Sequence, residues 1–455
     1  MPPPLPPSKL SPSLVTLPPH ILEIIHRLHQ DGHLAYLAGG SVRDFLLNRD
    51  SKDHDIATSA NPTQIAKLFP GSQLVGAHFG VVIVPASGQR WVEVATFRTD
   101  GSYGDGRRPK SVSYSTPEQD AQRRDFTING LFYDPETSTL IDHVNGQSDL
   151  KAQLIRAIGQ PTARFQEDHL RLLRAIRFAT TLGFSIEPAT WSALQQAAPL
   201  IAKISPERIR DELDRIWLSP HRQTGFDLLV HSGLMAQILP EILNLQGCEQ
   251  PPQFHPEGDV FVHTRLMLSK LPPDASLPLV LSVLFHDIAK PATQTTDPDT
   301  GRIRFNGHDK LGAEMTDAIL RRLKYSNDII EATTAAVANH MHFIGVQQMR
   351  ASTLKRFLAR PYIDDELELH RVDCLGSNGL LDNYEFLQQK RTEFANSPQP
   401  LIPPPLLTGR DLIALGLPPG PAFTAILHEA QSLQLEGTLT TKDQAIAWAK
   451  TQPPQ

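Results

Sequence analysis

Two aspartates separated by one residue, Asp53 and Asp55, are the side chains of this sequence best suited to chemistry. Residues two apart on an extended segment project to the same side, so the two carboxylates can hold two divalent cations together. Upstream, an apolar run leads into Gly39-Gly40, where the missing Cβ atoms let backbone N–H groups approach phosphate oxygens. This combination predicts phosphoryl or nucleotidyl transfer. The alternative, an ordinary loop-capping pair of aspartates, explains neither the spacing nor the glycines.

Length and composition limit the class of protein. A chain of 455 residues is too long for one core and predicts two to four domains. No run approaches eighteen uninterrupted apolar residues, so we expect no membrane-spanning helix. The two cysteines, Cys248 and Cys374, cannot form a disulfide framework and fit a reducing cytoplasm. The proline-rich start lacks the features of a signal peptide, so we expect a disordered tail in a cytoplasmic protein.

The net charge of −6 shows no overall nucleic-acid signature, so any contact with RNA must use local basic patches. Two such patches flank the aspartate pair. One contains Arg90, Arg98, Arg107, Arg108, Lys110, Arg123 and Arg124, and the other contains Arg164, Arg171, Arg174 and Arg177. A charge run is commonly a solvated face, but the position of these two favours phosphate or RNA binding.

Periodicity and capping residues predict the elements that position these side chains. An amphipathic helix is expected at 20–30, and a helix at 62–68 begins with Asn61 as N-cap and Pro62 at its first position. Strands are expected at 34–38, 54–57, 81–84 and 92–97. The pattern turns helical from about 160, with helices at 164–181, 188–197, 206–218 and 225–234. A Gly-, Pro- and Gln-rich stretch at 246–260 precedes a second helical unit at 260–385, and 397–405 reads as a stiff polyproline linker.

Four motifs, in this order, resemble the class II tRNA nucleotidyltransferase and poly(A) polymerase family, and the resemblance covers nearly the whole chain. They are Gly39-Gly40-Ser-Val-Arg43-Asp44, Asp53-His-Asp55, Arg123-Arg124-Asp125-Phe-Thr-Ile-Asn129 and Glu167-Asp168-His-Leu-Arg171-Leu-Leu-Arg174-Ala-Ile-Arg177-Phe178. The resemblance implies an α+β fold, with an N-terminal polymerase-beta-like mixed sheet domain followed by all-α domains that include an HD-type helical domain. The expected division is a disordered Pro-rich tail at 1–19, a catalytic head at 20–145, a helical base-recognition and RNA-binding domain at 146–245, an HD-type domain at 246–396, and a linker with a C-terminal helical segment at 397–455.

The family resemblance gives the transfer-site residues their expected roles. Asp53 and Asp55 would bind two Mg²⁺ ions, which need few carboxylates besides substrate phosphate oxygens. Glu93 is a candidate third acidic group, with an outward-facing strand carboxylate as the alternative. The triphosphate would meet Gly39, Gly40, Arg43 and Arg124, since guanidinium groups suit bidentate phosphate contacts. Asp125 and Asn129 resemble the family's ribose-reading pair, and the alternative is that they are turn or cap residues.

Asp168, Arg171, Arg174 and Arg177 recur every third residue of the helix predicted at 164–181. Each step on an α-helix drifts by about 60°, so Asp168 and Arg171 should be neighbours while Arg177 faces elsewhere. Leu170, Leu173 and Ile176 would anchor the other side. A simple amphipathic helix with a charged face is the alternative.

In the family, an Asp–Arg pair acts as a protein template, and Asp168 and Arg171 occupy its positions. A carboxylate accepts from the exocyclic amine of cytosine or adenine, and a guanidinium donates to the adjacent ring nitrogen. Uracil and guanine present a carbonyl there. Residues 93–109 also resemble the flexible loop of members that add the terminal A, and Gly101, Gly104 and Gly106 suit a mobile segment.

The histidines of the second helical unit resemble the HD phosphohydrolase superfamily. An apolar helix at 277–285 ends in His286-Asp287. The expected metal ligands are His263, His286, Asp287 and Asp373, with His308 and His340 available for a second ion. Imidazole and carboxylate ligands suit Mn²⁺, Ni²⁺, Mg²⁺ or Fe²⁺. A purely structural role for these histidines is the alternative, and His255 and His342 are expected to be bystanders.

These features predict a template-independent RNA nucleotidyltransferase that adds or repairs the 3′-terminal CCA of tRNA from CTP and ATP, with no membrane partner. Oligomeric state does not follow from the sequence. A poly(A) polymerase or an A-adding tRNA nucleotidyltransferase is the alternative within the class. An HD metal phosphohydrolase with RNA-binding front domains is the alternative from another class. An antibiotic-type small-molecule nucleotidyltransferase has no need for the Asp168–Arg171 pair.

Overall fold

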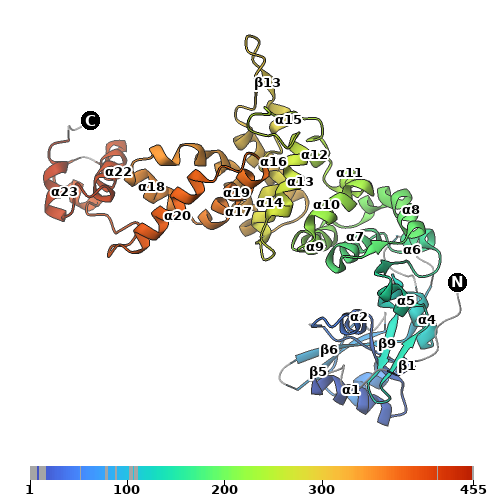
Figure 1. Cartoon of the computed structure of the whole chain (residues 1–455). Coiled ribbons are helices and arrows are strands. Elements are labelled where there is room, and N and C mark those ends of the chain that lie inside the picture. Colours follow the sequence, from blue (N-terminus) through green and yellow to red (C-terminus); the bar gives the residue numbers. More distant parts are fainter. Residues whose placement is uncertain are drawn as a thin grey trace. The chain divides into compact units, whose positions relative to one another are not determined.

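The structure is a computed structural model of the 455-residue chain, and it describes residues 8–9, 17–51, 53–76, 80–87, 90–101, 106, 111–417 and 419–452. The chain divides into two compact units, Met1–Pro240 and Glu241–Gln455, which are described separately. Figure 1 shows the mixed sheet of the first unit and the helices of the second. The division falls before the 246–260 stretch that the sequence suggested as a boundary. No helix in the described part of the chain is long and apolar enough to cross a membrane.

The first unit is built on an eight-stranded mixed sheet in the order β1-β10-β9-β2-β3-β6-β5-β4. Its strands are β1 (Ser8–Lys9), β2 (Ala35–Ala38), β3 (Ile56–Thr58), β4 (Gln73–Gly76), β5 (Val81–Ala86), β6 (Arg90–Thr96), β9 (Leu131–Asp134) and β10 (Thr139–Asp142). Only β3 and β6 pair in parallel, and the other neighbours are antiparallel. The four predicted strands correspond to β2, β3, β5 and β6. Strand β1 pairs with β10 and so gives structure to part of the predicted disordered tail, whose other residues up to 16 lie outside the described residues.

Short helices and an aromatic core fix the ends of these strands. Helices α1 (Pro19–Gln30), α2 (Gly40–Leu46), α3 (Pro62–Leu68) and α4 (Pro117–Gln122) surround the sheet. As predicted, Asn61 is the N-cap of α3 and Pro62 its first residue; the structure adds a capping box in which Asn61 and Gln64 satisfy each other's backbone N–H groups. The rings of Tyr36, Phe97 and Phe132 pack with centroids 5.7 to 6.2 Å apart. This core holds β2, β6 and β9 together beneath the site described below.

Helices complete the first unit. They are α5 (Gly146–Lys151), α6 (Pro161–Glu167), α7 (Arg171–Leu182), α8 (Pro188–Ala197), α9 (Pro206–Trp217), α10 (Arg222–His231) and α11 (Leu234–Ile238). The single helix predicted at 164–181 is wrong, because the backbone leaves helical geometry at Asp168 (φ −137°, ψ 108°) and a new helix starts at Arg171. Leu170, Leu173 and Ile176 are buried as expected.

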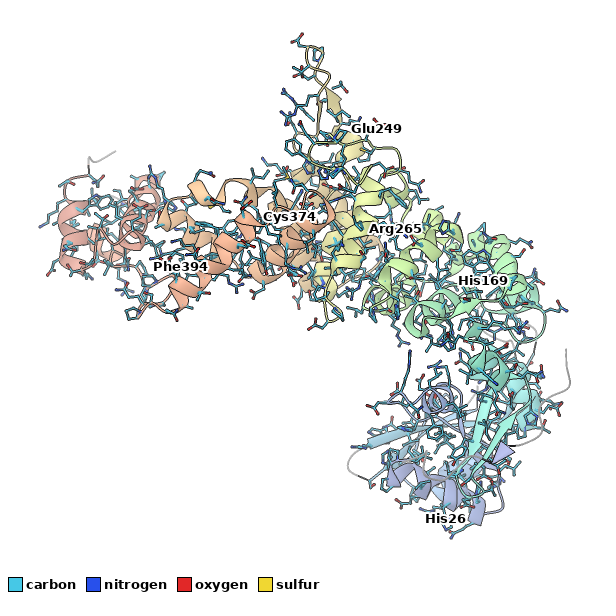
Figure 2. The ribbon with its side chains drawn as sticks, in the orientation of Figure 1. His26, His169, Glu249, Arg265, Cys374 and Phe394 are labelled. Atoms are coloured by element: carbon cyan, nitrogen blue, oxygen red, sulfur yellow. The ribbon has the colours of Figure 1, made fainter. Side chains whose placement is uncertain are left out.

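The second unit is helical, apart from a small hairpin of β13 (Thr295–Thr296) and β14 (Ile303–Arg304) that projects beside α15 (Lys290–Thr293). Its central helices are α13 (Val260–Lys270), α14 (Leu277–Phe285), α16 (His308–Arg322), α17 (Asn327–Asn339) and α19 (Ile363–Gly376). Figure 2 labels Arg265 on α13 and Cys374 on α19. Further along the chain come α18 (Ala351–Leu358) and α20 (Asp382–Ala395), then α21 (Gly409–Ala414), α22 (Pro421–Leu435) and α23 (Lys442–Ala449). Residues 397–405, all described, form neither helix nor strand, and their role as a stiff linker stays a prediction.

Candidate active site

The aspartate pair lies directly before β3, where the sheet supplies a third carboxylate. Strands β3 and β6 pair in parallel with Ile56 opposite Val94, so one residue earlier Asp55 stands beside Glu93 on the same face. Burial raises the pKa of Asp55; Arg124 opposes this shift, and the charge of Asp53 adds to it. Burial also raises the pKa of Glu93, and repulsion from the charge of Asp55 raises it further. The three carboxylates thus share one negatively charged place that suits a hard cation with oxygen ligands.

A cavity of about 660 Å³ in the first unit brings the predicted transfer-site residues together. Its walls include Gly39, Gly40, Arg43, Asp53, Asp55, Arg124, Asp125, Asn129, Asp168, Arg171, Arg174 and Arg177. Every transfer-site residue predicted from the sequence is present except Glu93. Segments more than a hundred residues apart in the chain therefore form one site, with the carboxylate pair and a set of arginines in its walls.

The turn between β2 and α2 forms one wall of this cavity and depends on Gly39. Its backbone has φ +69° and ψ −125°, a region open essentially to glycine alone. A Cβ at this position would lie 2.8 Å from Arg124 Nη1. Arg124 cannot easily move aside, because Asp120 accepts from its Nε and Nη2 at 3.1 and 3.0 Å. The backbone of this turn thus lies beside the Arg124 guanidinium, which Asp120 holds in place.

We expect Gly39→Ala to lower the free energy of unfolding by about 1–3 kcal/mol, the cost of a side chain in this backbone region. The matched control for stability is Gly40→Ala, because Gly40 has no positive φ and its added Cβ would meet Arg43 Nη2 only at 3.7 Å. Urea unfolding of both variants tests the prediction. Equal stability of the two would contradict it.

Carboxylates that the sequence did not single out hold the predicted phosphate-binding arginines. Arg43 donates to Asp44 at 2.8 Å and, through Nη1, to Asn129 Oδ1 at 2.7 Å. Arg124 is held by Asp120, which is fully buried. Asp44 could have been noticed because it follows Arg43 directly, whereas Asp120 stands four residues before Arg124, a spacing that brings two side chains together on a helix. Both guanidinium groups reach the cavity with their orientation already set.

Asp125 and Asn129 form a hydrogen-bonded pair. Asn129 Nδ2 donates to Asp125 Oδ1 at 3.0 Å, and Arg174 Nε donates to Asp125 Oδ2 at 2.7 Å. Burial acts to raise the pKa of Asp125, but Arg174 and Asn129 together hold it well below its usual range. The side chain is therefore a carboxylate acceptor at neutral pH, fixed between the head sheet and α7.

Asp168 and Arg171 both line the cavity, but their side chains are held by different partners. Asp168, in the break before α7, accepts from Leu170 N at 3.0 Å. Arg171 donates to Glu167 Oε2 at 2.7 Å and to the backbone oxygen of Arg123 at 2.9 Å. A turn therefore positions Asp168, and contacts with the Glu167 carboxylate and the Arg123 carbonyl oxygen position Arg171. The two side chains are not neighbours on one helix.

Helix α9 contributes residues that the sequence reasoning missed. Arg177, expected to face elsewhere, lines the cavity. Glu212 accepts from its Nε at 2.5 Å and holds the long side chain in this position. Arg208 Nη2 lies 3.7 Å from Asp168 Oδ2, and its Nη1 is buried with no hydrogen-bond partner among the described residues. Arg208, Glu212 and Arg215 are spaced i, i+4, i+7 on the predicted helix, which is the signal that could have identified them.

Residues 102–105 and 107–109 of the predicted flexible loop, which include Tyr103, Gly104, Arg107 and Arg108, lie outside the described residues. Gly101 and Gly106 are described. The carbonyl oxygen of Gly106 accepts from the backbone N–H of His169, which Figure 2 labels, at 3.0 Å. The described part of this segment therefore contacts the residue that follows Asp168.

The predicted histidine and aspartate residues of the second unit come together in a buried cluster. His263 lies on α13, His286 and Asp287 directly follow α14, His308 starts α16, and His340 follows α17. Three groups have ligand atoms all within 4.8 Å of one another. Two consist of predicted residues: His263, His286 and Asp287, and Asp287, His308 and His340. The third joins His263 to His255 and Glu257. Asp373, on α19 beside the labelled Cys374 (Figure 2), places Oδ1 3.1 Å from His263 Nε2. Asp287 is shared by the two groups of predicted residues.

The hydrogen bonds of this cluster leave nitrogen lone pairs pointing inward. The Nδ1 atoms of His286, His308 and His340 lie 3.0, 2.6 and 2.6 Å from backbone carbonyl oxygens, to which they donate. Their Nε2 atoms therefore act as acceptors or metal ligands. The Nε2 atoms of His263 and His286 are buried, and neither has a hydrogen-bond partner among the described residues. These two nitrogen atoms face the carboxylates of Asp373 and Asp287. A cation bound between the nitrogen and carboxylate oxygen atoms would fit this arrangement.

His255, which the sequence suggested as a bystander, contacts the cluster through a carboxylate. Its Nδ1 lies 2.9 Å from Glu257 Oε1, and the same oxygen lies 2.6 Å from His263 Nδ1. Glu257 was missed because it stands in the irregular stretch before α13, where no periodicity marks it. His342 is exposed and belongs to none of these ligand groups.

Three family models match the chain in sequence. They are the poly A polymerase head domain at residues 35–156, the probable RNA and SrmB-binding site of polymerase A at 183–245, and the HD domain at 259–371. An A-adding tRNA nucleotidyltransferase of Deinococcus radiodurans is 35% identical over 92% of this chain and 96% of its own. A CCA-adding enzyme of Lactobacillus gasseri is 32% identical over 93% and 95%.

Solved structures agree with these matches. A Bacillus stearothermophilus CCA-adding enzyme in complex with CTP has a TM-score of 0.73 and 26% identity, covering 95% of this chain and 97% of that one. A Thermotoga maritima CCA-adding enzyme complexed with tRNA, 20% identical with a TM-score of 0.64 over 97% and 98% of the two chains, shares the fold. From its sequence relatives and its site, this chain belongs to the class II tRNA nucleotidyltransferase and poly(A) polymerase family, and it carries an HD domain.

Proposed function

We propose that this chain adds the 3′-terminal CCA of tRNA, one nucleotide at a time, from CTP and ATP with release of pyrophosphate. The observation that carries the proposal is the single cavity that joins Asp53 and Asp55 to the segment of Asp168 and Arg171. The similarity to enzymes named for A addition and CCA addition to tRNA supports the substrate. Transfer would use residues 20–245, and 246–396 would form a separate catalytic domain.

Asp53 and Asp55 would hold two Mg²⁺ ions, with Glu93 as a third carboxylate beside them. Bound there, the ions would lower the pKa of the RNA 3′-hydroxyl and neutralise charge on the triphosphate and its leaving group. The turn at Gly39-Gly40 gives the phosphates room, and Arg43 and Arg124 orient them from fixed positions. Asp125 and Asn129 would accept from and donate to the ribose hydroxyls, which favours a ribonucleotide.

Base choice would rest on Asp168 and Arg171, with Arg174 and Arg177 lining the same wall. The carboxylate of Asp168 accepts from an exocyclic amine and repels a carbonyl oxygen, so C and A fit where U and G do not. Arg208, near Asp168, would hold that carboxylate in position. Selection by protein side chains requires no nucleic-acid template.

We expect Asp168→Ala and Arg171→Ala to admit UTP or GTP, with a smaller effect on triphosphate binding, because base edges carry identity while phosphates carry affinity. Misincorporation on a tRNA transcript, with each nucleotide supplied alone, measures the effect. Glu207→Gln, an exposed carboxylate on α9 outside the cavity walls, is the control. Variants that lose all activity while staying strictly selective for C and A would sink this assignment.

Incubation with three tRNA transcripts separates CCA addition from A-only and poly(A) addition. The transcripts end before the first C, after C and after CC, and each receives CTP, ATP or both. CCA addition predicts that, with both nucleotides present, all three transcripts are extended to the same final length. Extension of the third transcript alone, by one A, would identify an A-adding enzyme, and long tails from ATP would identify a poly(A) polymerase.

The buried cluster of the second unit supports a further hydrolytic function. We propose that the HD domain hydrolyses a phosphoester, such as a 2′,3′-cyclic phosphate or a phosphomonoester. His263, His286, Asp287 and Asp373 would hold one metal ion, and His308 and His340 would hold a second with Asp287. Mn²⁺, Ni²⁺ or Mg²⁺ would supply a water nucleophile of lowered pKa. Such an activity would let one chain repair damaged RNA 3′ ends before extending them.

A further inference from the structure

One histidine of the HD cluster differs from the others in the partner of its second nitrogen. His286, His308 and His340 each donate Nδ1–H to a backbone carbonyl. His263 instead donates to the Glu257 carboxylate at 2.6 Å. A hydrogen bond to an ionised acceptor is roughly twice as strong as one to a neutral acceptor, so the His263 ring is held more firmly and is made more basic than the other three.

The Glu257 carboxylate is directed at this ring. The side chain of Glu257 is 8% exposed and that of His263 is fully buried. Among the described residues, the ion-pair partners of Glu257 are His255 and His263, with no lysine or arginine. Its second oxygen, Oε2, is buried and has no hydrogen-bond partner in the described part of the chain. The negative charge is therefore not neutralised by a fixed cation and acts on the imidazole.

The chain segment before α13 is folded to bring Glu257 to this position. Gly258 has φ +128°, so the backbone turns sharply between Glu257 and the N-cap residue Asp259. Asp259 Oδ2 accepts from Gly247 N at 2.6 Å, and Val260 N donates to Cys248 O at 3.1 Å, which fastens the segment to the start of α13. These bonds fix the carboxylate within reach of His263.

His255 contacts the same carboxylate oxygen as His263. It donates Nδ1–H to Glu257 Oε1 at 2.9 Å, and its ring packs against that of His263 with centroids 5.0 Å apart. One oxygen thus accepts from both rings, and the two rings also contact each other.

We propose that Glu257 is a positioning residue of the HD metal site: it fixes the His263 ring with Nε2 toward the metal position and strengthens that nitrogen as a donor, while His255 holds Glu257 in place. The inference rests on the proposed metal site of the HD domain. With Nδ1 protonated and bound to Glu257, the lone pair of Nε2 faces Asp373 and His286, where the ion would lie. Carboxylates in this outer position typically contribute a 10–100-fold gain in metal affinity.

Metal binding by the full chain tests the proposal without relying on catalysis. The host protein carries Asp53→Asn and Asp55→Asn, so that Co²⁺ binding reports the histidine cluster, and affinity is measured from the Co²⁺ absorption bands in competition with a chelator. We expect Glu257→Ala to weaken Co²⁺ binding by about 10–100-fold. Glu257→Gln should weaken it less, because the amide oxygen still accepts from His263 but carries no charge. His255→Ala should have the smallest effect of the three.

Glu241→Gln is the matched control, since Glu241 pairs with Arg322 in the same unit and contacts no histidine. The midpoint of thermal unfolding without metal should match the host for Glu257→Gln, and the rise in that midpoint on adding Co²⁺ should shrink. Glu257 variants that bind Co²⁺ like Glu241→Gln would overturn the inference alone. A host protein that binds no Co²⁺ would overturn the proposed HD metal site together with the inference.

Discussion

Nucleotide addition should fall by a factor on the order of 10³ or more in Asp53→Ala and in Asp55→Ala. The metal ions held by this pair would contribute several kcal/mol of transition-state stabilisation, and each 1.36 kcal/mol corresponds to about tenfold in rate. Either substitution removes a ligand that the other carboxylate cannot replace alone. Single-turnover incorporation of CTP into a tRNA ending before CCA measures the loss.

Binding of tRNA should be largely retained in both variants, because the basic residues of the first unit are untouched, and a gel-shift titration checks this. Glu118→Gln is a suitable control: Glu118 is an exposed carboxylate in the first turn of α4 and lies outside the cavity walls. It should retain the wild-type rate. Incorporation near the wild-type rate in either aspartate variant would remove the metal-binding role from this pair.

The second large effect is expected in the HD domain. His286→Ala/Asp287→Ala should reduce metal-dependent hydrolysis of a 2′,3′-cyclic phosphate or a phosphomonoester to background. Asp287 presents Oδ2 to His286 at 3.0 Å and Oδ1 to His308 at 3.4 Å, so its loss removes a ligand from both proposed metal positions. The assay uses the full chain with added Mn²⁺, Ni²⁺ or Mg²⁺.

Asp287→Asn accompanies the double variant, because it removes the charge of the side chain but keeps its volume. Lys290, which contacts Asp287 at 2.7 Å, then has an uncharged partner. His342→Ala, at an exposed position outside the ligand groups, should hydrolyse like the wild type. Addition of CTP and ATP should persist in all three variants, since the transfer cavity belongs to the first unit. Equal turnover in wild type and double variant would leave the cluster a structural role only.

Local sequence determined the parts of this protein that depend on near neighbours. The alternation of Asp53 and Asp55, the glycine turn before them and the helix start at Asn61-Pro62 are set by backbone geometry within a few residues, and each was predictable. The apolar helix ending in His286-Asp287 was likewise predictable to its last residue, Phe285. Sequence motifs in family order then predicted residues that line one cavity, because each motif is short and its members are close together in the chain.

Tertiary structure alone decided how distant segments complete the two sites. At Asp168 the backbone leaves helical geometry and the carboxylate accepts from Leu170 N, and nothing in the run of arginines indicates this break. Arg177 enters the cavity because Glu212, thirty-five residues later, holds it. Glu257 reaches His263 through a turn at Gly258 in a segment without periodicity. For Arg177 and Glu257, a charged side chain that is largely removed from water needs a partner, and the chain fold, not the local sequence, determines which partner lies within reach.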